Sequence, residues 1–182
     1  MLALHPPTRN PALQTPGRGD AALRRHRVSR PGASCFLTLC TDQRTPGLTA
    51  PAIARALRDE CQSIERDAHW QVRAAVIMPD HLHVLVCLTG RLEISRCVAR
   101  LKTKTKLVLN AARLVWQTNF YEHRLRAGDP VEAVVRYIFL NPDHAALVPP
   151  GETYPHFWLG ESESAWFTPT TDIGRPFPEW LR

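Results

Sequence analysis

Apolar and polar residues follow two different rhythms along this chain. Strict alternation predicts strands, because successive side chains of a strand point to opposite faces of a sheet. Recurrence every three or four residues predicts helices with one buried side. The expected strands are 33–41, 70–78 and 81–88, the expected helices are 50–67, 92–113 and 129–141, and the segment 115–125 is expected to be extended.

The third expected strand carries two histidines on one face, because His81 and His83 are separated by a single apolar residue. The two positions lie roughly 6.5–7 Å apart along the backbone. An odd-length turn centred on Pro79 would put Val76 and Met78 on the opposite, apolar face and leave the histidines facing outward. Two neutral imidazoles on one strand are a suitable start for a divalent-metal site. A pair of polar residues on a half-solvated sheet face would show the same pattern.

The last expected helix places a tyrosine one turn before an asparagine. Asp129 and Pro130 fit its start, as a capping residue followed by a first-turn proline. Pro142 should end the helix at Asn141. Tyr137 and Asn141 then share a flank of the helix, away from the centre of its apolar stripe. An aromatic at the edge of a core and a helix-end asparagine would also fit this spacing.

Together, these side chains suggest phosphodiester chemistry. Tyrosine is a weak nucleophile because its pKa is about 10, but a divalent ion that polarises a phosphate allows it to attack. The amide oxygen of Asn141 could complete a metal site with His81 and His83, and such ligands suit Mg²⁺ or Mn²⁺. Tyr121 and Tyr154 are competing nucleophiles, but neither has an asparagine four residues later.

The overall charge favours a polyanionic partner. The 182 residues fit one domain with tails. A formal charge of +6 and a pI near 9.4 point first to nucleic acid. A basic surface that contacts only solvent would have the same composition. Contact with the phosphates of a nucleic acid is the other interpretation of these residues. The candidate DNA-binding residues are Arg96, Arg100 and Lys104, which step by four along the second helix, and Arg24 and Arg25 in a flexible Pro- and Arg-rich arm over 1–31.

Cysteine usage and hydropathy predict a soluble intracellular protein. The five cysteines are odd in number and form no CxxC pair, so each is expected to pack as a small apolar residue in a reducing cytoplasm. The chain contains no run of 18 apolar residues and no signal-peptide core, so no membrane association is expected.

Three motifs follow one another in a recognisable order. They are His81-Leu82-His83 within MPDHLHVLV, the stretch WQTNFYEH at 116–123, and YIFLNP at 137–142. In this order they resemble the REP-associated tyrosine transposases, which are single-tyrosine members of the HUH nuclease superfamily. The segment from Arg24-Arg25-His26 to Pro31-Gly32 is similar too, so the resemblance covers about residues 24–142.

The resemblance implies a ferredoxin-like α+β fold, in which an antiparallel sheet has helices packed on one face and the active site on the other. The nuclease domain would span 32–147, with a C-terminal extension over 148–182. The implied activity is that of a metal-dependent single-stranded DNA endonuclease and strand transferase. It would cleave next to REP-like palindromic hairpins through a covalent 5′-phosphotyrosine intermediate. The protein would be bacterial, and it would act as a monomer or a homodimer.

The resemblance also assigns roles residue by residue. The nucleophile would be Tyr137, the metal site His81, His83 and Asn141, and a supporting motif Glu122 and His123. The chain departs from the family pattern at 143–146, where a more basic, glycine-containing stretch is expected. Two alternatives stay open, namely a hydrolytic metallonuclease that forms no covalent intermediate and a hairpin-binding module without catalysis.

Overall fold

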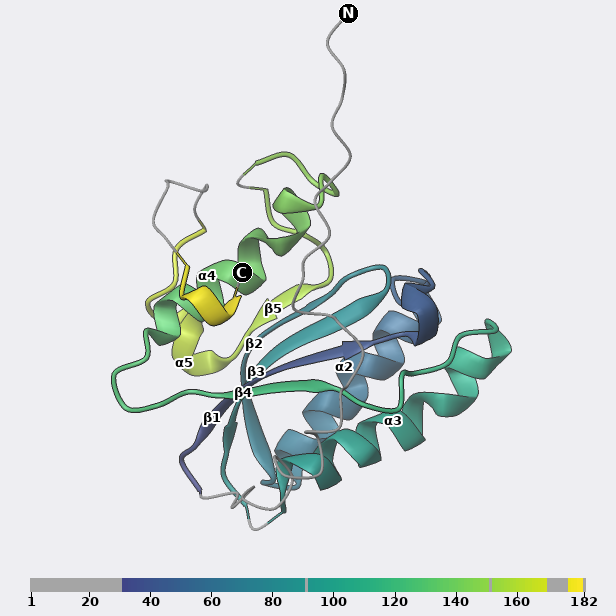
Figure 1. Cartoon of the computed structure of the whole chain (residues 1–182), viewed down its shortest axis with the longest axis horizontal. Coiled ribbons are helices and arrows are strands. Elements are labelled where there is room, and N and C mark those ends of the chain that lie inside the picture. Colours follow the sequence, from purple (N-terminus) through teal and green to yellow (C-terminus); the bar gives the residue numbers. More distant parts are fainter. Residues whose placement is uncertain (1–30, 91, 151, 170–176, 182) are drawn as a thin grey trace, which may run out of the picture.

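The computed structural model describes residues 31–90, 92–150, 152–169 and 177–181. They form a five-stranded antiparallel sheet in the order β4-β1-β3-β2-β5, with helices on both faces (Figure 1). The strands are β1 Ser34–Cys40, β2 Trp70–Ile77, β3 His81–Leu88, β4 Tyr121–Arg124 and β5 Phe157–Leu159. The fold is α+β, as expected.

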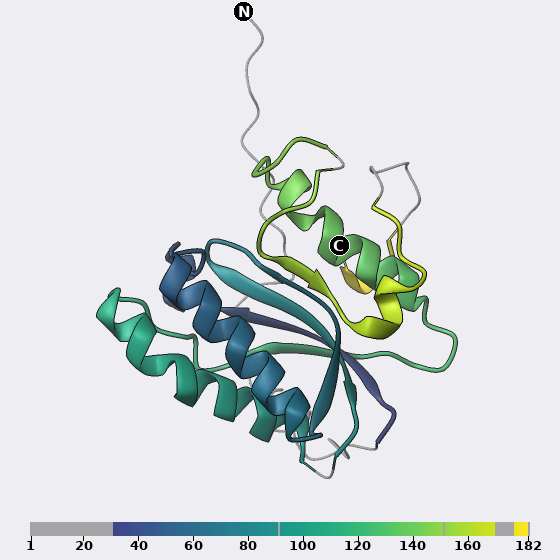
Figure 2. The same cartoon turned by 180° about the vertical axis from the view of Figure 1, so that it is seen from behind.

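The helices divide between the two faces of the sheet. Helices α2 (Pro51–Arg66) and α3 (Ile94–Ala111) cover one face, and α4 (Val131–His144) lies on the other (Figure 2). Helices α2 and α3 each bury one stripe, because apolar residues three and four apart share a side, whereas α4 is buried around most of its circumference. The α2 stripe consists of Ile53, Ala54, Leu57, Cys61 and Ile64. The short elements are the 3₁₀ turns η2 (Asp42–Arg44) and η3 (Glu179–Leu181) and the helix α5 (Glu161–Ser164).

The hairpin between β2 and β3 corrects the expected strand parity. The Met78 backbone N–H donates to the His81 carbonyl at 2.8 Å, so the turn has two residues and not an odd number. Val76 therefore pairs with His83, and Val76 and Met78 lie on the histidine face. That face does not look outward either. Packing of α4 and the C-terminal residues leaves the histidines 7% and 6% exposed.

The end of α4 also differs from the expectation. The helix continues through Pro142 to His144. Proline lacks an N–H and so removes one helical hydrogen bond, but the next turn still closes, because the Ala145 N–H donates to the Asn141 carbonyl at 3.1 Å. At the other end Pro130, not Asp129, occupies the N-cap position, and Asp129 instead accepts a hydrogen bond from the Arg126 N–H.

The C-terminal extension, which shows no periodic pattern, joins the sheet. Strand β5 pairs with β2, and α5 follows it at once. Arg73 Nε donates to Glu163 Oε1 at 2.6 Å, and the Glu163 side chain is 1% exposed. Gly160 lies so close to the Val72 carbonyl that a Cβ atom would collide with it. The ion pair and this close approach fix α5 to β2.

Replacing Glu163 with alanine should lower the free energy of unfolding by about 2–3 kcal/mol, because the substitution leaves Arg73 without its buried counter-ion. Urea denaturation measures this effect. Glu161→Ala, an exposed change in the same short helix, should stay within about 0.5 kcal/mol of the unaltered chain. Equal losses in the two variants would show that the ion pair contributes nothing specific.

The cysteines and the hydropathy of the helices can be compared with what the sequence predicts. All five cysteines are free thiols, and four of them are buried, as expected for small apolar residues. Across the described ranges, no helix is both long enough and apolar enough to cross a bilayer.

Candidate active site

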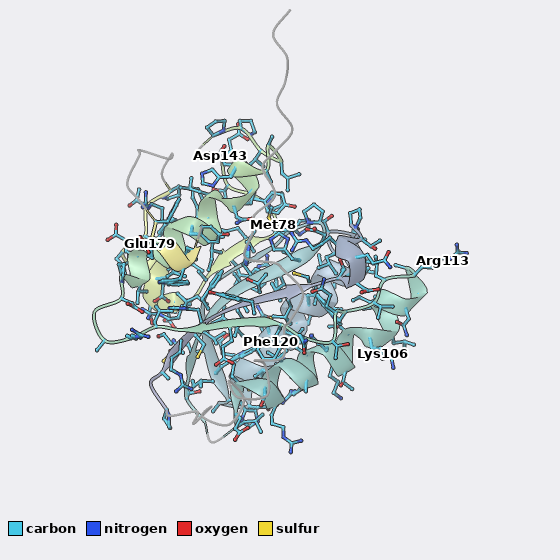
Figure 3. All side chains as sticks on the ribbon, viewed as in Figure 1. Met78, Lys106, Arg113, Phe120, Asp143 and Glu179 are labelled. Atoms are coloured by element: carbon cyan, nitrogen blue, oxygen red, sulfur yellow. The ribbon has the colours of Figure 1, made fainter. Side chains whose placement is uncertain are left out.

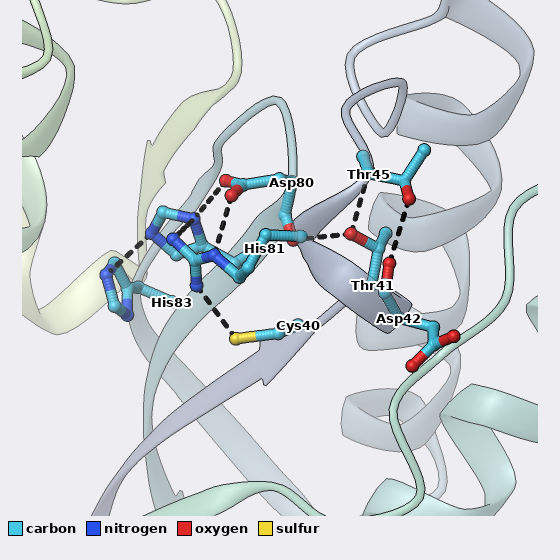
Figure 4. Close-up of polar contacts among 8 residues, drawn as sticks. Cys40, Thr41, Asp42, Thr45, Asp80, His81 and His83 are labelled. Atoms are coloured by element: carbon cyan, nitrogen blue, oxygen red, sulfur yellow. Dashed lines mark hydrogen bonds and ion pairs between the residues drawn. The ribbon is translucent and has the colours of Figure 1, made fainter. Parts of the chain in front are cut away.

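The two histidines at the start of β3 direct their Nε2 atoms toward each other. His81 Nε2 and His83 Nε2 lie 2.9 Å apart. Their other nitrogens have polar partners. His83 Nδ1 lies 2.9 Å from Thr38 Oγ1. His81 Nδ1 lies 2.7 Å from Asp80 Oδ1, a contact that Figure 4 shows. Such a partner on Nδ1 favours the tautomer that leaves Nε2 as an acceptor or metal ligand.

The surroundings of the pair favour uncharged imidazoles. Burial lowers the pKa of His81, although its contact with Asp80 opposes the shift. Burial lowers the pKa of His83 further, and the proximity of His81 and Arg44 adds to it. For Asp80, burial acts to raise the pKa, but the hydrogen bond and charge of His81 and the charge of Arg44 outweigh it and lower the pKa. The site thus combines neutral histidines with an ionised carboxylate behind them.

This geometry fits a divalent ion. Neighbouring ligands of an octahedral ion, each about 2.1 Å from it, are about 3 Å apart, which is the separation of the two Nε2 atoms. Within the described residues no group of three or more His, Cys, Asp or Glu side chains could hold a metal. A further ligand would therefore have to be of another type, and the amide of Asn141 is adjacent, because its side chain hydrogen-bonds His81.

Tyr137 on α4 reaches the same place. Its ring centroid lies 5.6 Å from that of His83 and 5.9 Å from that of Phe36. Burial raises the pKa of the Tyr137 hydroxyl, while a hydrogen bond from Asn141 and the charge of Arg44 oppose the increase. The structure therefore brings together all four residues predicted for the nucleophile and the metal site.

The supporting motif splits between the two faces of the sheet. In β4, His123 pairs with Phe36 on the Tyr137 side, whereas Glu122 pairs with Leu37 on the α2 and α3 side. His123 stacks on Trp180, with ring centroids 3.6 Å apart and planes 8° apart. Glu122 thus faces away from the histidine pair, and only His123 lies on the site face.

The competing tyrosines differ in position. The Tyr121 hydroxyl donates to the Trp180 carbonyl at 3.4 Å, and the ring lies on the same face as Tyr137. Tyr154 is 8% exposed and packs in the core against His156. Tyr121 is therefore the nearer competitor, although it has no asparagine beside it in the helical spacing of Tyr137.

The basic face of α3 is separate from this site. Arg100, expected to contact phosphate, instead turns toward α2, where its guanidinium pairs with Glu60 at 2.7 Å and Asp67 at 2.6 Å. Arg96 and Lys104 are exposed on the same helix, across the sheet from the histidines. Figure 3 shows the nearby side chains Lys106 and Arg113 extending outward at the periphery. DNA contact by Arg96 and Lys104 stays a prediction, and Arg24 and Arg25 fall outside the described residues.

Three residues that contact the site were not predicted from the sequence: Thr38, Arg44 and Asp80. Asp80 precedes His81 directly, which was a usable signal. Thr38 is recognisable only from strand register, because it lies opposite His83 in β1. Arg44 reaches the site through the turn that follows β1, and its Nε pairs with Asp80 Oδ2 at 2.6 Å.

Replacing Thr38 with valine should weaken Mn²⁺ binding about tenfold, because His83 Nδ1 loses its partner and the ring its fixed orientation. The dependence of DNA cleavage on Mn²⁺ concentration, together with electron paramagnetic resonance of bound Mn²⁺, measures the change. Thr38→Ser keeps the hydroxyl and should bind like the unaltered chain. Unchanged binding by Thr38→Val would contradict this role.

Comparison with known proteins identifies the family. Residues 32–139 match the family model described as "Transposase IS200 like". The chain is 30% identical over 114 residues to the REP-associated tyrosine transposase of Escherichia coli (strain K12), an alignment that covers 61% of this chain and 67% of that relative. The protein therefore belongs to the IS200-like transposase family.

A solved structure supports the fold independently. A REP-associated tyrosine transposase bound to a REP hairpin superposes with a TM-score of 0.59 at 24% identity, covering 75% of this chain and 90% of that one. At this identity the match establishes the architecture alone. The resemblance drawn from the three sequence motifs is confirmed at the level of family and fold.

Proposed function

We propose that this transposase cleaves and rejoins single-stranded DNA beside REP-like palindromic hairpins, through a covalent bond between Tyr137 and a 5′-phosphate. The observation that carries the proposal is the convergence of Tyr137 and Asn141 from α4 on the paired Nε2 atoms of β3. The names of the E. coli relative and of the hairpin-bound structure support the choice of DNA hairpin.

His81, His83 and the amide oxygen of Asn141 hold a Mg²⁺ or Mn²⁺ ion in this proposal. When bound, the ion supplies positive charge that polarises the scissile phosphate. The amide group of Asn141 serves both partners, because its oxygen faces the histidines while its NH₂ group donates to the Tyr137 oxygen. It thereby sets the nucleophile at a fixed position relative to the metal-binding nitrogens.

Tyr137 then forms the new bond. Its Oη attacks phosphorus as the bond to the 3′ oxygen breaks. The hydroxyl proton passes to solvent, and the departing 3′ oxygen takes up a proton to become a 3′-OH. Donation from Asn141 stabilises the phenolate that develops. Attack on that phosphotyrosine by a DNA 3′-OH reverses the chemistry and joins the strands.

The test is incubation of the full chain with a single-stranded oligonucleotide taken from the flanks of its own gene. The reaction contains Mn²⁺ or Mg²⁺, and the products are separated under denaturing conditions. The expected product is a protein–DNA adduct that requires metal and the hairpin, and a matched oligonucleotide with the hairpin stem scrambled should give none. Cleavage without an adduct would favour a hydrolytic metallonuclease, and binding without cleavage would favour a binding module.

A further inference from the structure

The turn after β1 has an unusual backbone. Gln43 and Arg44, two consecutive residues with side chains, adopt the left-handed conformation, with φ values of 51° and 57°. Each such residue costs about 1–2 kcal/mol. Strain of this kind persists where the surroundings impose it, and it concentrates at functional sites. The second residue of this pair, Arg44, contacts His81.

The surroundings that impose the conformation can be identified. The Thr41 N–H donates to the Asp80 carbonyl at 3.0 Å, and the N–H groups of Gly47 and Leu48 both donate to the Pro79 carbonyl. The fully buried Thr41 hydroxyl lies 2.7 Å from the Thr45 carbonyl oxygen (Figure 4). The turn is therefore fastened to the same two-residue hairpin turn that positions His81.

Arg44 is the side chain that this turn delivers to the site. Its Nε donates to Asp80 Oδ2 at 2.6 Å, while the other oxygen of that carboxylate lies 2.7 Å from His81 Nδ1. One carboxylate thus holds the guanidinium and the first histidine together. The Arg44 side chain is 37% exposed, so a ligand entering the site can reach it.

The two Nη groups of Arg44 lie next to poor hydrogen-bond acceptors. Nη1 lies 2.9 Å from the sulfur of Cys40. Burial raises the pKa of that thiol despite the charge of Arg44, and a neutral thiol is a poor acceptor. Nη2 lies 3.2 Å from His81 Nδ1. In the tautomer that leaves Nε2 to a metal, Nδ1 carries the proton given to Asp80, so it cannot accept from Arg44. The Nη groups are left suited to an anionic oxygen.

We propose that Arg44 contacts the substrate, with its Nη groups donating to a non-bridging oxygen of the phosphate that Tyr137 attacks. Negative charge grows on these oxygens as phosphorus is attacked, and a planar guanidinium matches them in charge and geometry. Asp80 acts as a positioning residue, because it fixes the guanidinium and His81 in one arrangement. The inference rests on the proposed function, since it assigns a second cation to the same reaction.

The test separates substrate contact from a structural role. Once the adduct has located the scissile phosphate, that position is made as each of the two methylphosphonate stereoisomers, in which one non-bridging oxygen is replaced by a methyl group. Arg44→Gln and Arg44→Lys are compared with Arg55→Gln, which removes an exposed arginine from α2 on the opposite face. Single-turnover cleavage, Mn²⁺ affinity and thermal unfolding are measured for each variant.

Arg44→Gln should slow cleavage of the normal phosphodiester about 100-fold, with Lys restoring part of the rate. With one methylphosphonate stereoisomer the same substitution should change the rate less than about threefold, because the contact is already missing. Arg55→Gln should behave like the unaltered chain. An equal loss on all three substrates, no loss on any, or Mn²⁺ affinity falling in step with rate would overturn the inference.

The two proposals fail differently. If the unaltered chain forms no adduct with any hairpin, the proposed function falls and this inference falls with it. If the unaltered chain forms the adduct and Arg44→Gln forms it at the same rate, only the role of Arg44 is wrong. Should Arg44→Gln fail to fold, the lysine variant supplies the same comparison, because its point charge lacks the two-pronged donor geometry.

Discussion

Tyr137→Phe should abolish the protein–DNA adduct and slow strand cleavage at least about 1,000-fold, the scale seen when an enzyme loses its nucleophile. Phenylalanine lacks the oxygen that forms the bond to phosphorus. Its ring keeps the packing against Phe36, His83 and Phe177. The folded structure should therefore survive, with a stability loss of about 1 kcal/mol for the missing hydrogen bond to Asn141.

Denaturing electrophoresis of the adduct and circular dichroism of the variant together measure this effect. Tyr121→Phe is the matched control, because it removes a neighbouring hydroxyl on the same face, which donates to the Trp180 carbonyl. That control should form the adduct at close to the unaltered rate. An adduct that persists in Tyr137→Phe and disappears in Tyr121→Phe would move the nucleophile to β4.

Removing the histidine pair should have the next largest effect. His81→Ala and His83→Ala together should reduce cleavage about 1,000-fold or more, because no imidazole is left to hold the ion that polarises the phosphate. Hairpin affinity measured without metal should change little, since neither side chain is needed to recognise the stem. Each buried histidine that is truncated leaves a cavity, so a stability loss of about 2–4 kcal/mol is expected as well.

The single and double variants can be separated by metal titration. High Mn²⁺ should restore part of the rate to either single variant, whose remaining imidazole still binds, and none to the double variant. His156→Ala, placed just before β5, controls for loss of a half-buried histidine elsewhere. Full activity of the double variant would exclude these two residues from metal binding, whatever else they stabilise.

Much of the fold was readable from the sequence because most elements have one clearly apolar side. The α2 stripe and the paired histidines of β3 fall where alternation and helical spacing put them. The sequence did not predict correctly which residues of β2 lie on the same face of the sheet as the histidines. Both faces of this strand are covered, so Ala75 and Val76 are each fully buried although they point opposite ways. Only the two-residue turn distinguishes the two registers.

The site was predictable in part for a related reason. Its reactive groups sit on regular elements, where a spacing of two in β3 and of four in α4 fixes their relative directions. The position of the Arg44 side chain depends on the left-handed backbone of the turn after β1. The residue types in that turn do not predict this conformation. Arg100 has the spacing of a solvated basic face, yet its partners Glu60 and Asp67 are 40 and 33 positions away in the chain. Long-range pairing of this kind leaves no local signal.

The proposed function requires Tyr137 to become covalently attached to DNA at the histidine pair. The measurement that tests it most directly is proteolysis of the adduct formed in Mn²⁺, followed by mass spectrometry of the modified peptide. We expect one modified residue, Tyr137, linked to the 5′-phosphate of the downstream fragment, with a free 3′-OH on the other fragment. A nucleotide attached to any other residue, or linked through a 3′-phosphate, would contradict it.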